Sequence, residues 1–488
     1  MDNTKAQRQI KNDLTEGPIV KKILTFALPI VAGNLLLQFY NVVDSIVIGQ
    51  YAGADAVAAV GVSNPIMMLF NALFMGLSMG ANIIISQTYG ARDMEKLKRS
   101  VNTVLGLAFA VGIIITIMGL TLAKPLLRLL NTPANIFDDA AIYLTVIYTG
   151  MLGNVFFNNG SGILRGMGDS RWPLLALTIS CVMNIVLDIW FVFGLHWGVA
   201  GVAWATIIGQ TFSGLVLAWR IHHFGHGIKL SLKMMLRPDK EITVNIFRLG
   251  LPSGIQAMAM SLGGIITQSF ANTFGSSFIA ANTMVMRLDG FAMMPLMGLG
   301  MSSTTFVGQN MGAGNSERAR KGVYKILSMV AVTGVIMGLI MYFFCEYFML
   351  AFTSEEHVIA IAVSGVRLIC FVYMFMGFEQ TLAGSMRGAG VAIVPMVISI
   401  ISNSFFRIPI AYFLAVRPNN YMGMFYAMAT TMVLGATMEF LYFQFGNWRE
   451  KGVVVAGRRA AATAEIGESE AGDDVPSELP PADDSLTD

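Results

Sequence analysis

The stretch 75–91, MGLSMGANIIISQTYGA, returns 222 residues later as 297–313, MGLGMSSTTFVGQNMGA. Both copies begin with Met-Gly-Leu and carry a glutamine three residues before a closing Gly-Ala. Other residues recur at the same offset or one residue out of step: Leu28-Pro29 as Leu251-Pro252, Arg165-Gly166, Gly168 and Pro173 as Arg387-Gly388, Gly390 and Pro395, and Gly201 and Ala205 as Gly423 and Ala427. Chance does not hold one offset across hundreds of residues, so the chain is two copies of one unit.

The composition places both copies in a membrane. Of the 488 residues, 55% are hydrophobic and 13% are charged, and the mean hydropathy is +0.63. A soluble domain carries roughly a quarter charged residues. This composition therefore excludes a soluble enzyme, and duplicated membrane units with a site at their interface are typical of secondary transporters.

Apolar segments near the length that crosses the hydrocarbon core predict twelve helices, because backbone hydrogen bonds must be satisfied internally in lipid. The expected spans are 20–50, 57–86, 100–122, 136–160, 172–195, 199–220, 243–272, 278–308, 321–349, 357–384, 391–415 and 421–446. We therefore expect an all-α membrane protein with two six-helix lobes related by a pseudo-twofold axis along the membrane normal. The expected segments are a cytoplasmic N-terminal segment (1–17), an N-lobe (18–221), a cytoplasmic linker (222–241), a C-lobe (242–448) and an acidic, disordered cytoplasmic tail (449–488).

Lysine and arginine gather at both chain ends and in the loops after even-numbered spans, whereas the other loops hold only Lys124, Arg128 and Arg417. By the positive-inside rule both termini are cytoplasmic. The first 16 residues have no short apolar core of the kind that marks a signal peptide. We therefore expect a multi-pass protein of a bacterial-type inner (plasma) membrane.

Ionisable residues inside apolar spans are costly and mark function by default. Asp44 lies in the first span and Asp188 in the fifth. Tyr40 precedes Asp44 by four residues and Asn184 precedes Asp188 by four, so each carboxylate shares a helix face with a polar companion. Together with a hydroxyl such as Thr206, these oxygens suit a sodium ion. A carboxylate pair removed from water can instead hold a proton near neutral pH.

The repeat argues that this polar group is functional. The offset of 222 maps Asp44 onto Ile266, Asn184 onto Phe406 and Asp188 onto Ile410, so the C-terminal half lacks it. Residues that only held the fold together would be expected in both halves. The alternative is that the two carboxylates are buried polar links between helices.

Other residues inside the spans are candidates for lining a substrate cavity. Glu379 and Arg407 lie on consecutive spans and can be either a buried ion pair or substrate contacts. Flexible thioethers suit a cavity that accepts many shapes, although most methionines in such spans pack against helices or lipid. The full candidate set is Gln38, Tyr40, Asn41, Met258, Met284, Met286, Asp289, Glu379 and Arg407.

The segments 165–169 (RGMGD) and 387–390 (RGAG) are rich in glycine. No strand precedes them and no phosphate-binding lysine follows, so nucleotide binding is excluded. We interpret both as tight cytoplasmic turns. Three scattered cysteines predict neither a disulfide nor a metal site.

Over residues 18–446 the chain resembles the multidrug and toxic compound extrusion (MATE) family. The resemblance rests on Leu28-Pro29, 40–44, 87–91 with its echo 309–313, 165–169, 184–188 and 198–201. It implies two six-helix lobes in a V, antiport of organic cations against H⁺ or Na⁺, and an N-lobe cation site at Asp44, Asn184, Asp188 and Thr206, with Tyr40 beside it. Span seven has no carboxylate, so the chain looks closer to the DinF-like and MepA-like bacterial branch than to the NorM-type branch.

The expected function is secondary active efflux of organic, mostly cationic amphipathic compounds in exchange for H⁺ or Na⁺. The alternative is a lipid-linked oligosaccharide or polysaccharide flippase, which would need several basic residues deep in the spans. An enzyme is not expected, because no catalytic cluster falls within the spans. We expect no cofactor besides the coupling ion, no nucleic-acid partner, and a monomer within the lipid bilayer as the functional unit.

Overall fold

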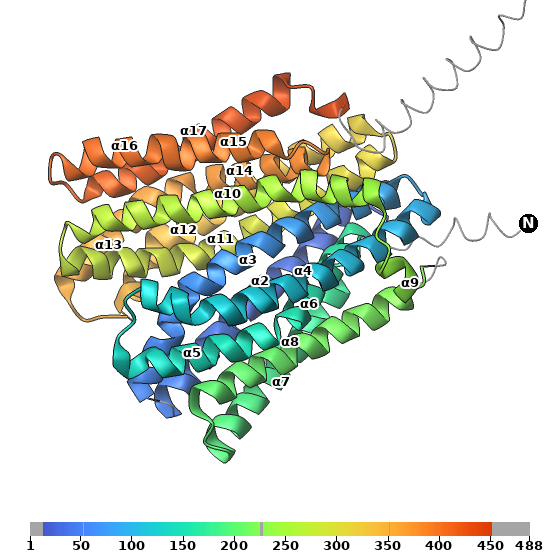
Figure 1. Cartoon of the computed structure of the whole chain (residues 1–488). Coiled ribbons are helices and arrows are strands. Elements are labelled where there is room, and N and C mark those ends of the chain that lie inside the picture. Colours follow the sequence, from blue (N-terminus) through green and yellow to red (C-terminus); the bar gives the residue numbers. More distant parts are fainter. Residues whose placement is uncertain (1–12, 52, 225–227, 351, 451–488) are drawn as a thin grey trace, which may run out of the picture.

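The computed structural model describes residues 13–51, 53–224, 228–350 and 352–450. Every regular element in these ranges is helical. The predicted disordered tail lies almost wholly outside them, as do the first twelve residues. Figure 1 shows two helical bundles side by side, one made by the first half of the chain and one by the second.

The N-lobe helices are α2 (Ile19–Tyr51), α3 (Gly53–Gly90), α4 (Met94–Leu129), α5 (Ala134–Thr149), α6 (Met151–Gly166), α7 (Arg171–Asp188) with the π-helical η1 (Ile189–Gly194), and α8 (Gly198–His222). The short α9 (Leu232–Met235) lies in the linker. The C-lobe contains α10 (Lys240–Asn272), α11 (Ser276–Gly312), α12 (Ser316–Leu350), α13 (Glu356–Ile369), η2 (Cys370–Val372), α14 (Tyr373–Gly388), α15 (Ile393–Ile400), η3 (Ile401–Phe406), α16 (Arg407–Ala411), η4 (Tyr412–Val416), α17 (Met422–Phe445) and η5 (Trp448–Glu450).

Length and hydropathy single out nine membrane-spanning helices within the described ranges, or ten if α5 and α6, bent by 50°, form one span. The helices α3 and α11 are not among them. Both belong to the predicted twelve, and both lie between the lobes, where α3 packs on α10 and α11 packs on α2. The second half of α11, from Ser302 to Gly312, is buried throughout. This protein-covered segment does not need the apolar surface that lipid requires.

Glycines bring the lobes together along α3. A Cβ on Gly76 would lie 2.6 Å from the Gly250 carbonyl of α10, and one on Gly80 would lie 2.3 Å from the Ile246 carbonyl. At the end of α3, a Cβ on Gly90 would lie 1.9 Å from the Gln309 carbonyl of α11. Small residues permit this backbone-to-backbone packing. We call the end of the molecule where Gly90 meets α11 the closed end.

Two hydrogen bonds related by the repeat cross the closed end. Gln87 donates to the Gly388 carbonyl at 2.8 Å, and Gln309 donates to the Gly166 carbonyl at 2.9 Å. Each glutamine therefore binds the last residue of a helix in the opposite lobe, α14 or α6. The carbonyls at a helix end have no partner within their own helix, so these donors satisfy groups that would otherwise be orphaned.

The segment before α2 lies across the same closed end. The Leu14 amide donates to Gln309 Oε1 at 3.0 Å, and Arg318 donates to the Gly17 carbonyl at 2.7 Å. Arg92, just after α3, forms ion pairs with Asp13 at 3.2 Å and with the exposed Glu16 at 2.6 Å. The segment is therefore attached to both lobes.

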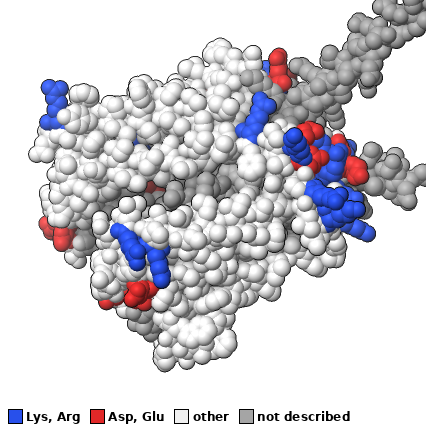
Figure 2. Space-filling view, viewed as in Figure 1, with Lys and Arg blue, Asp and Glu red and all other residues white. Residues whose placement is uncertain are grey.

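Charged side chains are distributed as expected for a membrane protein. Figure 2 shows Lys, Arg, Asp and Glu near the two ends of the molecule, with a wide surface between them that is almost free of charge. Large apolar side chains such as Leu215, Phe343 and Phe405 are well over half exposed. This uncharged band is the surface that lipid covers.

Candidate functional site

Three N-lobe helices bring polar side chains together in the bilayer region. Asn184 of α7 donates to the Thr206 hydroxyl of α8 at 3.3 Å. The hydroxyls of Thr206 and Tyr40 of α2 are 3.2 Å apart. The spacing of four residues predicted that Tyr40 and Asn184 would accompany the two aspartates, and the structure joins both to Thr206.

The two carboxylates lie beside this polar set. Asp44 and Asp188 are electrostatic neighbours of one another and of Tyr40. Asp188 is the last residue of α7, and the π-helical η1 follows it directly. Single π-helical turns are frequent at functional sites. Nothing in the sequence indicates this change in helix type.

Most of the carboxylate and amide oxygen atoms of this group lack hydrogen-bond donors. Asp188 is 1% exposed and Asn184 is 2% exposed. Within the described residues, both Asp188 oxygens, one Asp44 oxygen and the Asn184 amide oxygen have no hydrogen-bond partner. Buried polar atoms are costly unless something satisfies them. These oxygen atoms can be satisfied by a proton or by a hard cation such as Na⁺, which takes oxygen ligands. The ligand atoms would come from Asp44, Asn184, Asp188 and Thr206.

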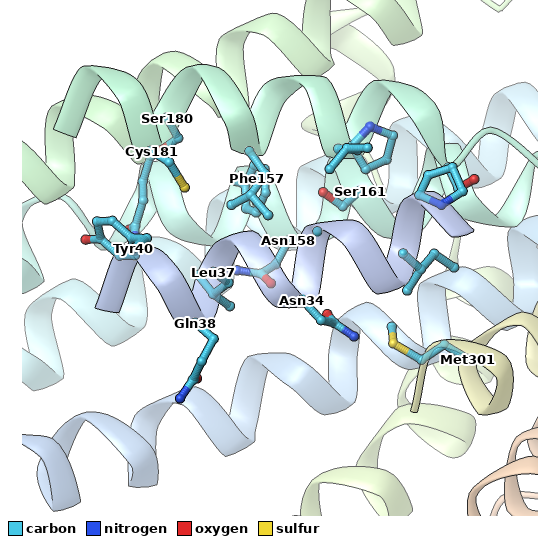
Figure 3. A pocket seen from close by; sticks show the side chains of 18 of the residues that line it. Asn34, Leu37, Gln38, Tyr40, Phe157, Asn158, Ser161, Ser180, Cys181 and Met301 are labelled. Carbon is cyan, nitrogen blue, oxygen red and sulfur yellow. The ribbon is translucent and has the colours of Figure 1, made fainter. Parts of the chain in front are cut away.

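A cavity of about 520 Å³ adjoins the group. Tyr40, Asn184 and Thr206 line its wall, together with Gln38 and residues of α3, α6 and α11. Figure 3 shows Tyr40, Ser180 and Cys181 at one end of the cavity and Ser161 and Met301 toward the other. This volume suits a drug-sized ligand.

Several lining residues were not predicted. Neutral amides form a chain along α6 and α8, in which Asn154 donates to Gln210 at 2.9 Å and Asn158 donates to Asn154 at 2.9 Å. Arg165 also lines the cavity, from the last turn of α6. The sequence had placed it in a turn. Methionines complete the wall, and for Met75, Met294 and Met297 the sequence did indicate a place facing the pore; the fourth is Met301.

The methionines of the candidate set are not among the described residues that line this space. Met284 packs against the C-lobe core, and Met286 is 62% exposed. Met258, on α10, is partly buried. The side chain of Asn41 lies outside those that the structure describes.

The charged C-lobe candidates lie in two buried groups. Asp289 accepts a hydrogen bond from Tyr373, which links α11 to α14. Glu379 accepts one from Asn403 at 3.1 Å and has Arg407 in its electrostatic neighbourhood. Both groups connect neighbouring helices, and neither lines the N-lobe cavity.

Comparison with known families matches this architecture. A family model described as MatE fits residues 29–190 and, a second time, residues 252–413. The chain belongs to the MATE family. Each match covers the core of one lobe, so the family unit is the repeat that the sequence contains. MATE proteins are transporters, and this chain is therefore a transporter and not an enzyme.

Relatives of this MATE chain carry names that refer to multidrug resistance. The chain is 31% identical to the probable multidrug resistance protein YpnP of Bacillus subtilis, covering 90% of this chain and 97% of YpnP. It is 28% identical to the probable multidrug resistance protein YoeA of the same organism, covering 87% and 93%. A solved multidrug resistance MATE transporter in an outward-facing conformation superposes with a TM-score of 0.83 at 25% identity, covering 90% and 97%. The family is thus one of multidrug efflux transporters with two lobes in a V.

Proposed function

We propose that the protein is a secondary active antiporter that exports organic, mostly cationic amphipathic compounds in exchange for H⁺ or Na⁺. One observation carries this proposal. The neighbouring carboxylates Asp44 and Asp188 have unpartnered oxygens and adjoin Tyr40, Asn184 and Thr206, which line the large cavity. An ion bound to the carboxylates can therefore change the wall that a substrate touches.

The coupling follows from electrostatics. An ion at Asp44 and Asp188 cancels the negative charge that attracts a cationic substrate to that end of the cavity. Substrate and ion are then bound alternately, each favouring a different arrangement of the lobes. A ligand shifts such an equilibrium only as far as its affinities for the two states differ.

The orientation completes the proposal. With both termini in the cytoplasm, the closed end faces the cytoplasm and the cavity is reached from outside. Opening of the closed end then gives access from the cytoplasm. One chain contains the whole pathway, so a monomer suffices.

The test is uptake of a fluorescent organic cation into proteoliposomes under a pH gradient or a sodium gradient, each imposed alone. We expect one of the two gradients to drive transport by the wild type. Asp188→Asn or Asp44→Asn should each reduce the transport rate at least about tenfold, because each removes an ionisable group from the membrane interior. Asp289→Asn is the matched control, because Asp289 is a buried aspartate of the other lobe.

Two results would contradict this proposal. If folded wild-type protein transports the cation under neither gradient, ion-coupled export is contradicted and a lipid flippase becomes the favoured function. Equal losses in Asp289→Asn and Asp188→Asn would mean that coupling does not reside in the N-lobe pair.

A further inference from the structure

Arg165 is the one charged side chain among the described residues that line the N-lobe cavity. No ion pair involves it within the described part of the chain. A guanidinium carries five donors and stays charged. Leaving it unpaired away from bulk water is costly. A partner is therefore missing from this position, and the cavity is where it fits.

The repeat supplies a direct comparison. Arg387 is the C-lobe counterpart of Arg165 at the offset of 222, and each lies in the last turn of its helix. Arg387 donates to Gln256 Oε1 at 3.2 Å and has Glu439 and Glu379 as electrostatic neighbours. The C-lobe arginine is thus surrounded by compensating groups within the protein.

The N-lobe lacks both compensating acids. The same offset maps Glu379 onto Phe157 and Glu439 onto Leu217, which are apolar. Phe157 lines the cavity, and Leu217 is fully buried. A simple role at a helix end, where basic residues are favourable, applies to both arginines and does not explain why only Arg387 has acidic neighbours among the described residues.

The cavity consequently differs in charge along its length. Arg165 and Ser170 lie where α6 ends and α7 begins, whereas Asn184 lies 14 residues further along the chain, beside Asp188. At 1.5 Å per helical residue, the two ends are about 20 Å apart. One end is positive, and the other adjoins two carboxylates.

We propose that Arg165 binds an acidic group of the substrate, so that the cavity selects amphipathic zwitterions. The carboxylate of the ligand pairs with the guanidinium, and its basic group lies toward Asp44 and Asp188. Arginine recognises a carboxylate through two parallel hydrogen bonds, and shielding from water strengthens them. The inference rests on the proposed function only in that the bound compound is also transported.

The test compares two dyes that differ by one charge, tetramethylrhodamine with its free carboxylate and its methyl ester. Binding to detergent-purified protein is followed by fluorescence anisotropy, without any gradient. We expect Arg165→Gln to weaken binding of the free acid about tenfold, equivalent to about 1.4 kcal/mol. Binding of the ester should change less than about twofold, because no charge pair is lost.

Two further sets of variants keep the test decisive if Arg165→Gln does not fold. Ser161 lies one turn before Arg165 and lines the cavity. Ser161→Asp supplies an internal carboxylate at the i,i+4 spacing and should reduce binding of the acid as Arg165→Gln does. Ser161→Asn is the uncharged match of nearly the same size, and the acid should lose clearly more affinity in Ser161→Asp than in Ser161→Asn. Arg171→Gln removes an exposed arginine of the same region and should change neither dye.

The inference would be overturned by any of three results. Both dyes could be affected equally, neither Arg165→Gln nor Ser161→Asp could change binding, or the wild-type protein could bind neither dye. Its failure is distinguishable from failure of the antiporter proposal. If gradient-driven transport is absent but Arg165 still favours binding of the free acid over the ester, only the proposed function is contradicted. Gradient-driven transport without that preference would remove only the role of Arg165.

Discussion

The Thr206 hydroxyl contacts side chains from two other helices, Asn184 of α7 and Tyr40 of α2. Thr206→Val keeps the shape and removes both hydrogen bonds. A net hydrogen bond is worth about 1 kcal/mol, so we expect the ion concentration that half-saturates transport to rise about fivefold for each bond lost. The measurement is initial transport rate against H⁺ or Na⁺ concentration in proteoliposomes.

A hydroxyl elsewhere in the N-lobe provides the control. Among the described residues, Thr178 bonds only the Leu174 carbonyl of its own helix. Thr178→Val should leave the ion dependence unchanged, and Thr206→Ser should restore most of it. An equal shift in both valine variants would show that Thr206 acts through general stability and not through the ion site.

At the scale of helices, the contact between α3 and α11 leaves no room for a methyl group at Gly90, where a Cβ would lie 1.9 Å from the Gln309 carbonyl. Backbone atoms on a packed helix move with the whole helix, so Gly90→Ala should force the closed end apart. Overpacking of this kind typically costs about 1–3 kcal/mol. We expect a lower melting temperature and a longer distance between spin labels at the exposed Glu95 and Glu317 of opposite lobes.

Gly61 of the same helix is the matched control, because a Cβ there would have nothing within 4 Å. Gly61→Ala should be neutral or slightly stabilising, since alanine favours helix over glycine. An unchanged label distance in Gly90→Ala would mean that the closed end tolerates the extra atom and is not tightly shut.

For the whole molecule, the twofold-related bonds of Gln87 and Gln309 hold the lobes together at the closed end. Gln87→Leu and Gln309→Leu should each shift the lobes toward opening about fivefold, the effect of about 1 kcal/mol. The Gln309 variant should shift further, because Gln309 also accepts from the Leu14 amide. The same pair of spin labels measures the populations.

Gln268 offers a comparison within one lobe, since the one partner to which it donates in the described ranges is Asn272 of its own helix. Gln268→Leu should leave the label distances unchanged. If all three leucine variants behaved alike, the shift would come from general loosening of the fold and not from the cross-lobe bonds.

The architecture could be predicted because repeat spacing and apolar length are properties of whole segments, insensitive to the position of any one side chain. Local breaks could not. The expected span 136–160 is two helices, α5 and α6, which meet at a 50° bend. Gly150 lies at that bend, where a Cβ would be 2.0 Å from Ile207. This close contact depends on a helix distant in sequence, so nothing local indicates it.

The polar group around Thr206 was largely predictable, and the cavity was not. A carboxylate in an apolar span is conspicuous, and the four-residue spacing ties Asn184 to Asp188. Neutral amides such as Asn158 are tolerated in membrane helices, and which face meets a cavity depends on how each helix rotates in the bundle. Arg165 was assigned to a turn because glycines follow it, although the helix continues through Gly166.

Hydrogen exchange in the segment across the closed end reports how often that end opens. The Leu14 amide proton is held by Gln309 of one lobe, and Arg92 of the other lobe holds Asp13 beside it. A backbone amide exchanges its hydrogen with solvent only when its bond opens. When the lobes separate at this end, the Leu14 amide proton becomes exposed to solvent. The rate of deuterium uptake at Leu14 therefore measures how often the transporter opens there, whichever substrate it carries.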